Sequence, residues 1–326
     1  MSNTIQVGGQ AVIEGVMMQT PGSLAVVVRK RNGELKIKRE HLDSFLSRIP
    51  FRGKPFLRGI LALVTALIKG MEALSYSAQQ CFEDEAGEAP ESLEKAPGRW
   101  IISLFLAIGV GCGILLFVVL PHALTALLGK IGNISMGVET ISFHLVDGVL
   151  KISFFLLYIW GISLIKDIRR VFQYHGAEHK AIGAYEAGQP LTLEAALPFS
   201  TIHRRCGTAF IMLVLAISIV LFSIAFPLVP GFRSLSIYET HIVAVVIKIM
   251  LFIPLTGITY EVIRAGDRYP QNVFLQALTR PGLWLQRMTT REPTAEQLEV
   301  ALTALKSALE MEQNRMDLSV RGHKDA

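Results

Sequence analysis

Two short segments of this sequence carry the residue types best suited to chemistry. Residues 174–180 read YHGAEHK, and residues 203–207 read HRRCG. On a helix, His175 and His179 stand one turn apart on the same face, a spacing at which two imidazoles can share a metal ion. Glu178 lies beside them, and the order His-x-x-Glu-His matches the inverted zincin motif, whose glutamate is the general base of a zinc hydrolase.

The second segment adds two candidate ligands. His203 and Cys206 have two residues between them, so a turn there brings an imidazole and a thiolate to one ion. Nitrogen and sulfur ligands favour zinc or iron over magnesium. The expected site therefore has a divalent metal, zinc by preference, the ligands His175, His179, His203 and Cys206, and Glu178 as its catalytic residue. Four protein ligands would make a closed structural site, whereas three would leave a position for a reacting water.

Each of these assignments has a plainer alternative. Histidines and basic residues near a membrane interface also contact lipid headgroups. Glu186 and Glu194 are alternative ligands in the same loop. Glu14 lies among the glycines of residues 8–18, and is either a further ligand, a partner for Arg58 or an exposed carboxylate. These glycines match neither the dinucleotide-binding nor the Walker pattern, so nucleotide binding is not supported.

The composition of the whole chain indicates a membrane protein. Of its 326 residues, 51% are hydrophobic and only 18% are charged, which is too apolar for an ordinary soluble domain. The three cysteines are widely spaced and odd in number, so they exclude a secreted disulfide framework and fit a reducing compartment. The net charge of +5 fits either nucleic acid or a cytoplasmic membrane face, and the distribution of basic residues decides between them.

Four stretches are long enough to cross a hydrocarbon core about 30 Å thick. They are residues 101–120, 141–165, 207–232 and 242–260. The first and third contain no charged residue, whereas the other two carry ionisable side chains, which are costly in a membrane and therefore indicate function.

The ionisable residues of the second stretch lie on one helical face. His144, Asp147 and Lys151 follow one another at three- and four-residue spacing, and the last stretch carries Lys248. The three residues form either a buried relay or a group that reaches out to the membrane interface.

The basic residues define the orientation. Of 32 Lys and Arg residues, thirteen lie in residues 1–100, six in 166–206 and nine in 261–326, whereas residues 121–140 and 231–241 hold one each. Because positive residues resist translocation, the rich side is the cytoplasm. We therefore expect a multi-pass protein of the bacterial inner membrane with both termini cytoplasmic. Lipid is its expected partner and nucleic acid is not.

The expected fold is mainly α, with a four-helix transmembrane region, a small N-terminal β element and a C-terminal amphipathic helix. Residues 1–56 are expected to form a β-containing cytoplasmic region, and residues 57–80 an amphipathic helix at the membrane surface or against the bundle. An acidic linker follows at residues 81–100. Residues 101–260 form the transmembrane region with its cytoplasmic loop 166–206, and residues 261–326 form a cytoplasmic helical region. Asn32-Gly33 predicts a two-residue hairpin turn. Thr294 and Gln297 predict a capping box, and the leucine stripe that follows is expected to pack on the cytoplasmic region or on a second copy of the chain.

Several motifs together resemble the YqhQ-like family of bacterial polytopic membrane proteins. The similar segments are residues 8–18, 175–180, 203–208 and 281–293, and the resemblance runs from about Gln6 to Lys306. It implies a predicted metal-dependent enzyme without an assigned substrate. One departure is Arg204, where the family usually has proline.

Three functions are compatible with these patterns. The first is a membrane-anchored zinc-dependent hydrolase with its site at the cytoplasmic face. The second is a noncatalytic scaffold with a closed structural metal site. The third is a transporter, which polar residues on several spans would favour. The sequence determines neither the substrate, the metal nor the oligomeric state.

Overall fold

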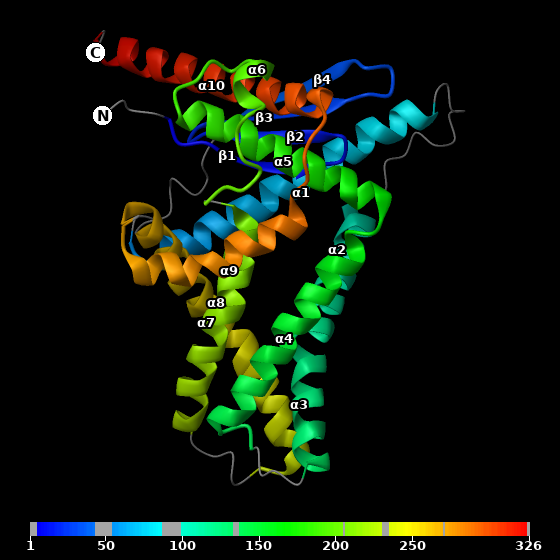
Figure 1. The fold of residues 1–326 in the computed structure, drawn as a ribbon, viewed down its shortest axis with the longest axis vertical. Helices are drawn as coiled ribbons and strands as arrows, with labels where there is room; N and C mark the ends of the chain where they lie inside the picture. The colour runs from blue at the N-terminus through cyan, green and yellow to red at the C-terminus, as the bar shows by residue number, and fades with distance from the viewer. Residues whose placement is uncertain are drawn as a thin grey trace. The chain divides into compact units, whose positions relative to one another are not determined.

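The chain folds into two compact units, each of which is discontinuous in sequence. The computed structural model describes residues 5–42, 54–86, 99–132, 137–204, 206–229, 235–269 and 271–324 (Figure 1). Unit 1 comprises Met1–Gly87, Ile162–Cys206 and Leu283–Ala326, and unit 2 comprises Glu88–Gly161 and Gly207–Gly282. Both histidine-containing segments therefore belong to unit 1.

Unit 1 is built on a four-stranded antiparallel sheet. The strands are β1 (Gly8–Val12), β2 (Gly15–Gln19), β3 (Ser23–Arg29) and β4 (Leu35–His41), in the order β1-β2-β3-β4. In β3 the side chains alternate between two hydrophobic clusters, with Ala25 and Val27 on one face and Val26 and Val28 on the other. Since all four are buried, the sheet is covered on both faces.

The β1–β2 and β3–β4 hairpins have different kinds of turn. Ile13 and Glu14 connect β1 to β2 as a two-residue turn, and Glu14 has a φ of 49°. The two-residue turn predicted at Asn32-Gly33 is wrong. Lys30 N–H donates to the Glu34 carbonyl and Gly33 N–H donates to the Lys30 carbonyl, which leaves a three-residue loop in which Gly33 alone has positive φ.

Two helices cover one face of the sheet. α5 (Lys166–Glu186) and α10 (Ala295–Lys324) share a hydrophobic cluster with alternate residues of β2 and β3 (Figure 1). The predicted capping box is confirmed, because Thr294 and Gln297 exchange side chain to backbone hydrogen bonds. The leucine stripe of α10 packs inside this cluster, through Leu298, Leu302, Leu305 and Leu309. The apolar stripe of α10 therefore packs against other elements of the same chain.

α1 (Leu57–Ala86) covers the other face of the sheet, six residues longer than predicted. Its sheet-facing side consists of small residues, including Gly70, Ala73 and Ser77. Val64 and Ile68, which belong to the apolar side of this amphipathic helix, are exposed. Small residues face the sheet because they let the helix backbone approach it closely, as Gly70 does at the Gln10 side chain. Of the predicted acidic linker, residues 87–98 lie outside the described part of the chain.

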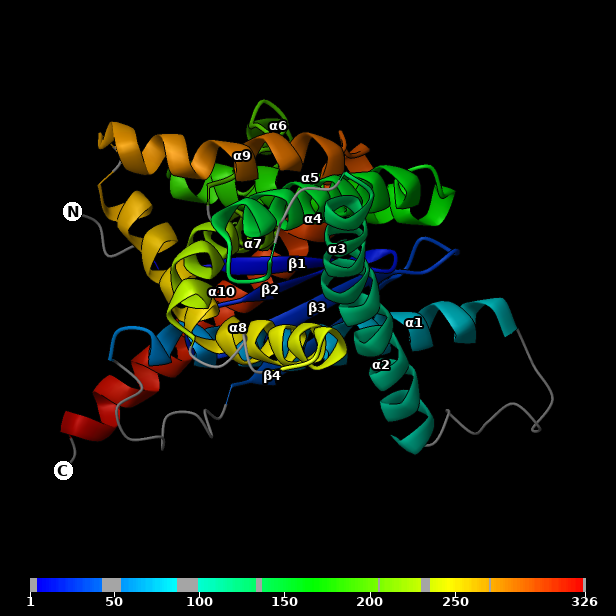
Figure 2. The same cartoon turned by 90° about the horizontal axis from the view of Figure 1, so that it is seen from below.

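In the residues that the structure describes, unit 2 has four helical segments that are long and apolar enough to cross a membrane. They are Ala107–Ile131, Ile141–Ile162, Gly207–Leu228 and Tyr238–Arg268. The underlying elements are α2 (Arg99–Ile114), the π-helix η3 (Leu115–Val119), α3 (Leu120–Ile131), α4 (Ile141–Ile162), α7 (Gly207–Ala225), the 3-10 helix η4 (Phe226–Leu228) and α8 (Ile237–Arg268). Figure 2 shows α3, α4, α7 and α8 from below. α6 (Leu193–Ala196) lies in unit 1, and α9 (Val273–Thr289) leads back into it. The predicted mainly α membrane fold with an N-terminal sheet is confirmed.

The first membrane helix does not end where the sequence suggested. It was expected to stop at Leu120, but it continues through Pro121 to Ile131. A proline removes one backbone donor and its ring collides with the preceding turn. Here the turn before Pro121 is a π-helix, in which Leu120 N–H donates to the Leu115 carbonyl five residues back, and this wider turn accommodates the ring.

Candidate metal centre

α5 presents the first histidine motif as a continuous helix. Its first turn contains Asp167, which suits the positive end of the helix dipole, and it ends before Gly188 at a φ of +67°. The predicted helical spacing of His175 and His179 is confirmed, and their ring centroids lie 4.5 Å apart.

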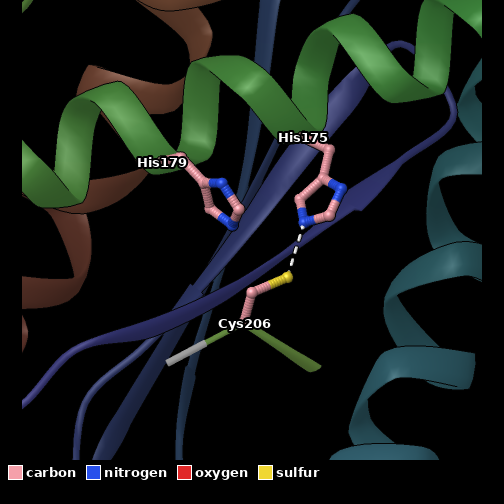
Figure 3. Close-up of side chains that lie close together, drawn as sticks. All are labelled: His175, His179 and Cys206. Atoms are coloured by element: carbon pink, nitrogen blue, oxygen red, sulfur yellow. Dashed lines mark hydrogen bonds between the residues drawn. The ribbon is translucent and has the colours of Figure 1, made fainter. Parts of the chain in front are cut away.

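Cys206 lies directly below these two rings (Figure 3). It precedes the first residue of α7, and its Sγ lies 3.1 Å from Nε2 of His175. One nitrogen from His175, one nitrogen from His179 and the sulfur of Cys206 all lie within 4.8 Å of one another. Within the described ranges, this is the group of His, Cys, Asp and Glu side chains arranged closely enough to hold a metal ion.

Backbone carbonyls orient both imidazoles. Nδ1 of His175 lies 2.8 Å from the Thr289 carbonyl, and Nδ1 of His179 lies 2.5 Å from the Thr201 carbonyl. A carbonyl can only accept, so each Nδ1 carries the ring proton and each Nε2 keeps its lone pair. Metal-binding histidines are oriented in the same way by outer partners.

The donor spacing fits a metal ion. Zinc binds imidazole nitrogen at ~2.0–2.1 Å and thiolate sulfur at ~2.3 Å, so neighbouring donors of a tetrahedral ion lie about 3.3–3.6 Å apart. The observed distance of 3.1 Å between His175 Nε2 and Cys206 Sγ is close to this range. Small side-chain movements are therefore sufficient for the three donors to hold one ion.

His203, the fourth predicted ligand, lies beside this group but outside it. Its ring centroid is 5.7 Å from that of His179, and its Nε2 lies 3.0 Å from Glu186 Oε2. The fully buried Gln286 fixes its backbone, because the amide group both donates to the His203 carbonyl and accepts from the His203 N–H, each at 2.8 Å. Glu194, an alternative ligand in the sequence, is exposed in α6 and is not part of the group.

Glu178 is buried next to the centre, against the edge strand of the sheet. A Cβ atom added to Gly9 would lie 2.7 Å from the Glu178 carboxyl, so the carboxyl occupies the space that this glycine leaves. Burial raises the pKa of Glu178 above its ordinary value, and the nearby His175 and His203 oppose the shift only in part. A carboxyl in such a place gains and releases its proton at higher pH than usual.

The run 286–292, which the sequence connected to function only by resemblance, wraps around α5. It supplies the Thr289 carbonyl to His175, and the Arg291 N–H donates to the Phe172 carbonyl. Gly176 permits this contact, since a Cβ there would lie 2.0 Å from the Arg291 carbonyl oxygen. Spacing within α5 could not reveal these partners, because they lie more than a hundred residues away.

Glu14 pairs with a residue other than the one expected. The sequence suggested Arg58 or a metal ion, but the Glu14 carboxylate accepts two hydrogen bonds from Arg170, both at 2.5 Å, and one from the Tyr174 hydroxyl at 3.1 Å. Both partners lie on α5, so Glu14 fixes the β1–β2 turn to the helix that carries the histidines.

Comparison with known proteins places the chain in a family. The model of the family described as protein of unknown function, DUF1385, matches residues 54–311. The uncharacterised protein YqhQ of Bacillus subtilis (strain 168) is 31% identical over 316 residues, which cover 94% of this chain and 92% of that protein. No solved structure matches the chain. The chain therefore belongs to the YqhQ-like DUF1385 family.

Proposed function

We propose that unit 1 is a metal-dependent hydrolase that binds zinc through His175, His179 and Cys206. The observation that carries this proposal is the convergence of two Nε2 lone pairs and one sulfur. Among these three atoms only the thiol has a proton to share, so a cation satisfies them better than a neutral molecule does. Three protein ligands are also the number typical of catalytic zinc sites, in which a fourth position stays open.

Bound zinc would supply Lewis acidity for the attack of water on a carbonyl or phosphoryl group. The protein's own general base is Glu178, which is adjacent to His179 in sequence and close enough to His175 and His203 to interact with their charges. Burial raises its pKa above that of an ordinary glutamate, which suits a group that takes up a proton and then returns it. His175 is only half-buried and leaves a side from which a substrate can approach.

The arrangement of unit 1 supports a cytoplasmic location for this site. Its three segments are separated along the chain by Glu88–Gly161 and Gly207–Gly282, and each separation contains two membrane-spanning helices. Segments that fold into one compact unit share one side of a membrane, and the bacterial inner membrane retains Lys- and Arg-rich segments on its cytoplasmic side. We propose that both termini lie there and that Val64, Leu67 and Ile68, exposed on α1, contact lipid.

A second candidate uses Cys206 itself as a nucleophile. His175 Nε2 is within reach of its thiol and the Thr289 carbonyl orients the ring, an arrangement that also suits a cysteine and its general base. Iodoacetamide separates the two candidates. If zinc occupies the site, a chelator accelerates alkylation of Cys206, whereas a cysteine nucleophile reacts equally fast with and without the chelator.

Glu178→Gln tests catalysis against a purely structural metal site. Glutamine keeps the shape of the side chain but cannot accept a proton at neutral pH. We expect full metal content, normal thermal stability and loss of complementation in a strain that lacks the protein. Glu186→Gln is the matched control, because this carboxylate lies on the same helix and contacts His203 instead of the metal-binding group. Full complementation by Glu178→Gln would exclude the hydrolase mechanism and favour the scaffold.

A further inference from the structure

Unit 2 contains a buried polar chain that the proposed hydrolase site does not use. Lys151 and Lys248 both donate to Oδ2 of Asp147, at 2.6 and 2.7 Å. Lys248 comes from α8, whereas the other two residues come from α4. The side chains of all three are at most 6% exposed. His144 is buried as well, which favours the buried group among the two alternatives that the sequence left open for His144, Asp147 and Lys151.

Two histidines extend this chain toward the start of α8. Nζ of Lys248 lies 3.0 Å from Nδ1 of His122, and Nε2 of His122 lies 3.0 Å from Nδ1 of His241. Since Lys248 donates, Nδ1 of His122 accepts, and its Nε2 therefore carries the proton that it donates to His241. His241 is the partly exposed member of the chain and lies in the second turn of α8.

The charges of the chain are not balanced. With Asp147 ionised and both lysines protonated, the buried groups carry one excess positive charge, which is costly inside a membrane. The faces of Phe143 and Phe222 lie 5.4 and 5.9 Å from Lys248 Nζ and offset part of that cost. Either lysine by itself would neutralise Asp147. Lys248 Nζ also contacts Nδ1 of His122, so its proton has an acceptor to which it can move.

Two buried atoms next to the chain have no hydrogen-bond partner in the described part of the structure. They are Oδ1 of Asp147 and Nδ1 of His144, three residues apart on α4. Nε2 of His144 contacts the Val138 carbonyl and so carries a proton, which leaves Nδ1 as an acceptor. Asp147 Oδ1 and His144 Nδ1 can therefore each accept a further hydrogen bond. This is expected of atoms beside a group that gains and loses a proton.

We propose that Lys248, His122 and His241 form a proton-exchange site in the membrane-spanning unit. Lys248 passes one proton to Nδ1 of His122, whose Nε2 proton moves to Nδ1 of His241, and His241 releases its own Nε2 proton to solvent. One N–H bond breaks and one forms at each histidine, so the net result is a neutral Lys248 amine and one released proton. The reverse sequence reloads the site. Polar residues of three spans, α3, α4 and α8, thus serve a proton-coupled function distinct from the hydrolase.

The test measures protons directly on the full-length protein in lipid nanodiscs. After a jump from about pH 9 to about pH 5, an indicator dye reports how many protons are taken up and how fast. Lys248→Met is expected to take up one proton fewer than the wild type. The matched control is Lys130→Gln, which removes an exposed lysine of α3 outside the buried chain and is expected to leave the proton count unchanged.

A second variant tests the path and does not alter the buried charge. His122→Asn retains an acceptor for Lys248, but an amide does not relay protons, so exchange at Lys248 is expected to slow by at least about tenfold. An unchanged proton count in Lys248→Met, or an unchanged rate in His122→Asn, would overturn the proposal. If Lys248→Met does not fold, the rate comparison still decides.

Discussion

At the scale of single residues, two backbone carbonyls determine what the histidines can do. The Thr289 and Thr201 carbonyls accept hydrogen bonds from the Nδ1–H groups and so direct both Nε2 atoms toward Cys206. A histidine without such a partner populates both tautomers and several ring orientations. In the proposed metal site, both imidazoles are therefore already oriented before a cation binds, which would lower the cost of binding.

The ligand assignment makes a first prediction. His175→Ala or His179→Ala should lower metal affinity by more than about 100-fold, since even loss of an outer partner costs about 10–100-fold. Cys206→Ser should lower it or change which metal binds. Metal content after dialysis is the measurement. His203→Ala is the internal comparison, because its ring contacts Glu186 and should be largely dispensable for binding. One metal per chain in His179→Ala would contradict the assignment.

Glu178 makes a second prediction, which concerns pH and the metal-free protein. Its pKa is raised in the folded state, so the stability due to the protonated carboxyl is complete below the ordinary value of 4.5 and is lost as pH rises toward the folded pKa. In that window this group lowers wild-type stability by up to about 1.4 kcal/mol per pH unit. Glutamine cannot ionise, so Glu178→Gln should gain stability relative to the wild type as pH rises above 4.5 toward the raised pKa of the glutamate. Thermal unfolding in the presence of a chelator measures this, and parallel curves for both proteins would count against a buried, neutral Glu178.

At the scale of elements, close backbone approach positions the site. β1 meets α5 at Gly9, and the chain after α9 meets α5 at Gly176. Both contacts are closer than a Cβ atom permits. Gly9 and Gly176 are therefore explained by these contacts between elements.

Neighbouring glycines of β1 supply a third prediction with its own control. Gly9→Ala would push against the Glu178 carboxyl at 2.7 Å, whereas Gly8→Ala meets no atom within 4 Å. We expect Gly9→Ala to cost about 1–3 kcal/mol and to impair complementation, because it overpacks a buried site and displaces the proposed base. Gly8→Ala should have little effect on either. Thermal unfolding and complementation of both variants are the measurements, and equal behaviour of the two would show that the contact with Glu178 is unimportant.

At the scale of the whole molecule, the order of the unit 1 segments along the chain is consistent with the number of candidate membrane-spanning helices between them. Unit 1 collects segments from the beginning, the middle and the end of the chain, and pairs of spanning helices separate them. An odd number of crossings in either separation would have placed parts of one compact unit on opposite sides of the membrane.

Orientation is the fourth prediction. Reporters fused after Ala326 and inserted near Ala89 should both indicate the cytoplasm, and one inserted near Asn133 should indicate the outside, because 28 of 32 basic residues lie in the three segments proposed to stay inside. Activity of paired reporters that work only inside or only outside the cell provides the measurement. An external signal at the C-terminus would refute both this orientation and the cytoplasmic location of the proposed site.

The sequence alone was sufficient to predict features that depend on residues close together along the chain. The four apolar helices, the helical histidine motif and the capping box at Thr294 follow from summed hydropathy and from spacing of three or four residues. The hydropathy of a segment and the spacing of its residues are the same whatever tertiary contacts the segment makes. The extent of the first span was misjudged for the opposite reason, because a π-turn let the helix continue through Pro121.

Only the tertiary structure decided which groups meet. Cys206 reaches His175 across 31 residues, the Thr289 carbonyl reaches it across 114, and Glu14 reaches Tyr174 across 160. The pairing of Asp147 with Lys248 spans 101 residues and two helices. Periodicity shows which face of an element a residue occupies, but not which other element that face will contact. Which element it contacts depends on how closely the two backbones can approach and on which buried polar groups can hydrogen-bond to one another. Both are properties of the assembled fold.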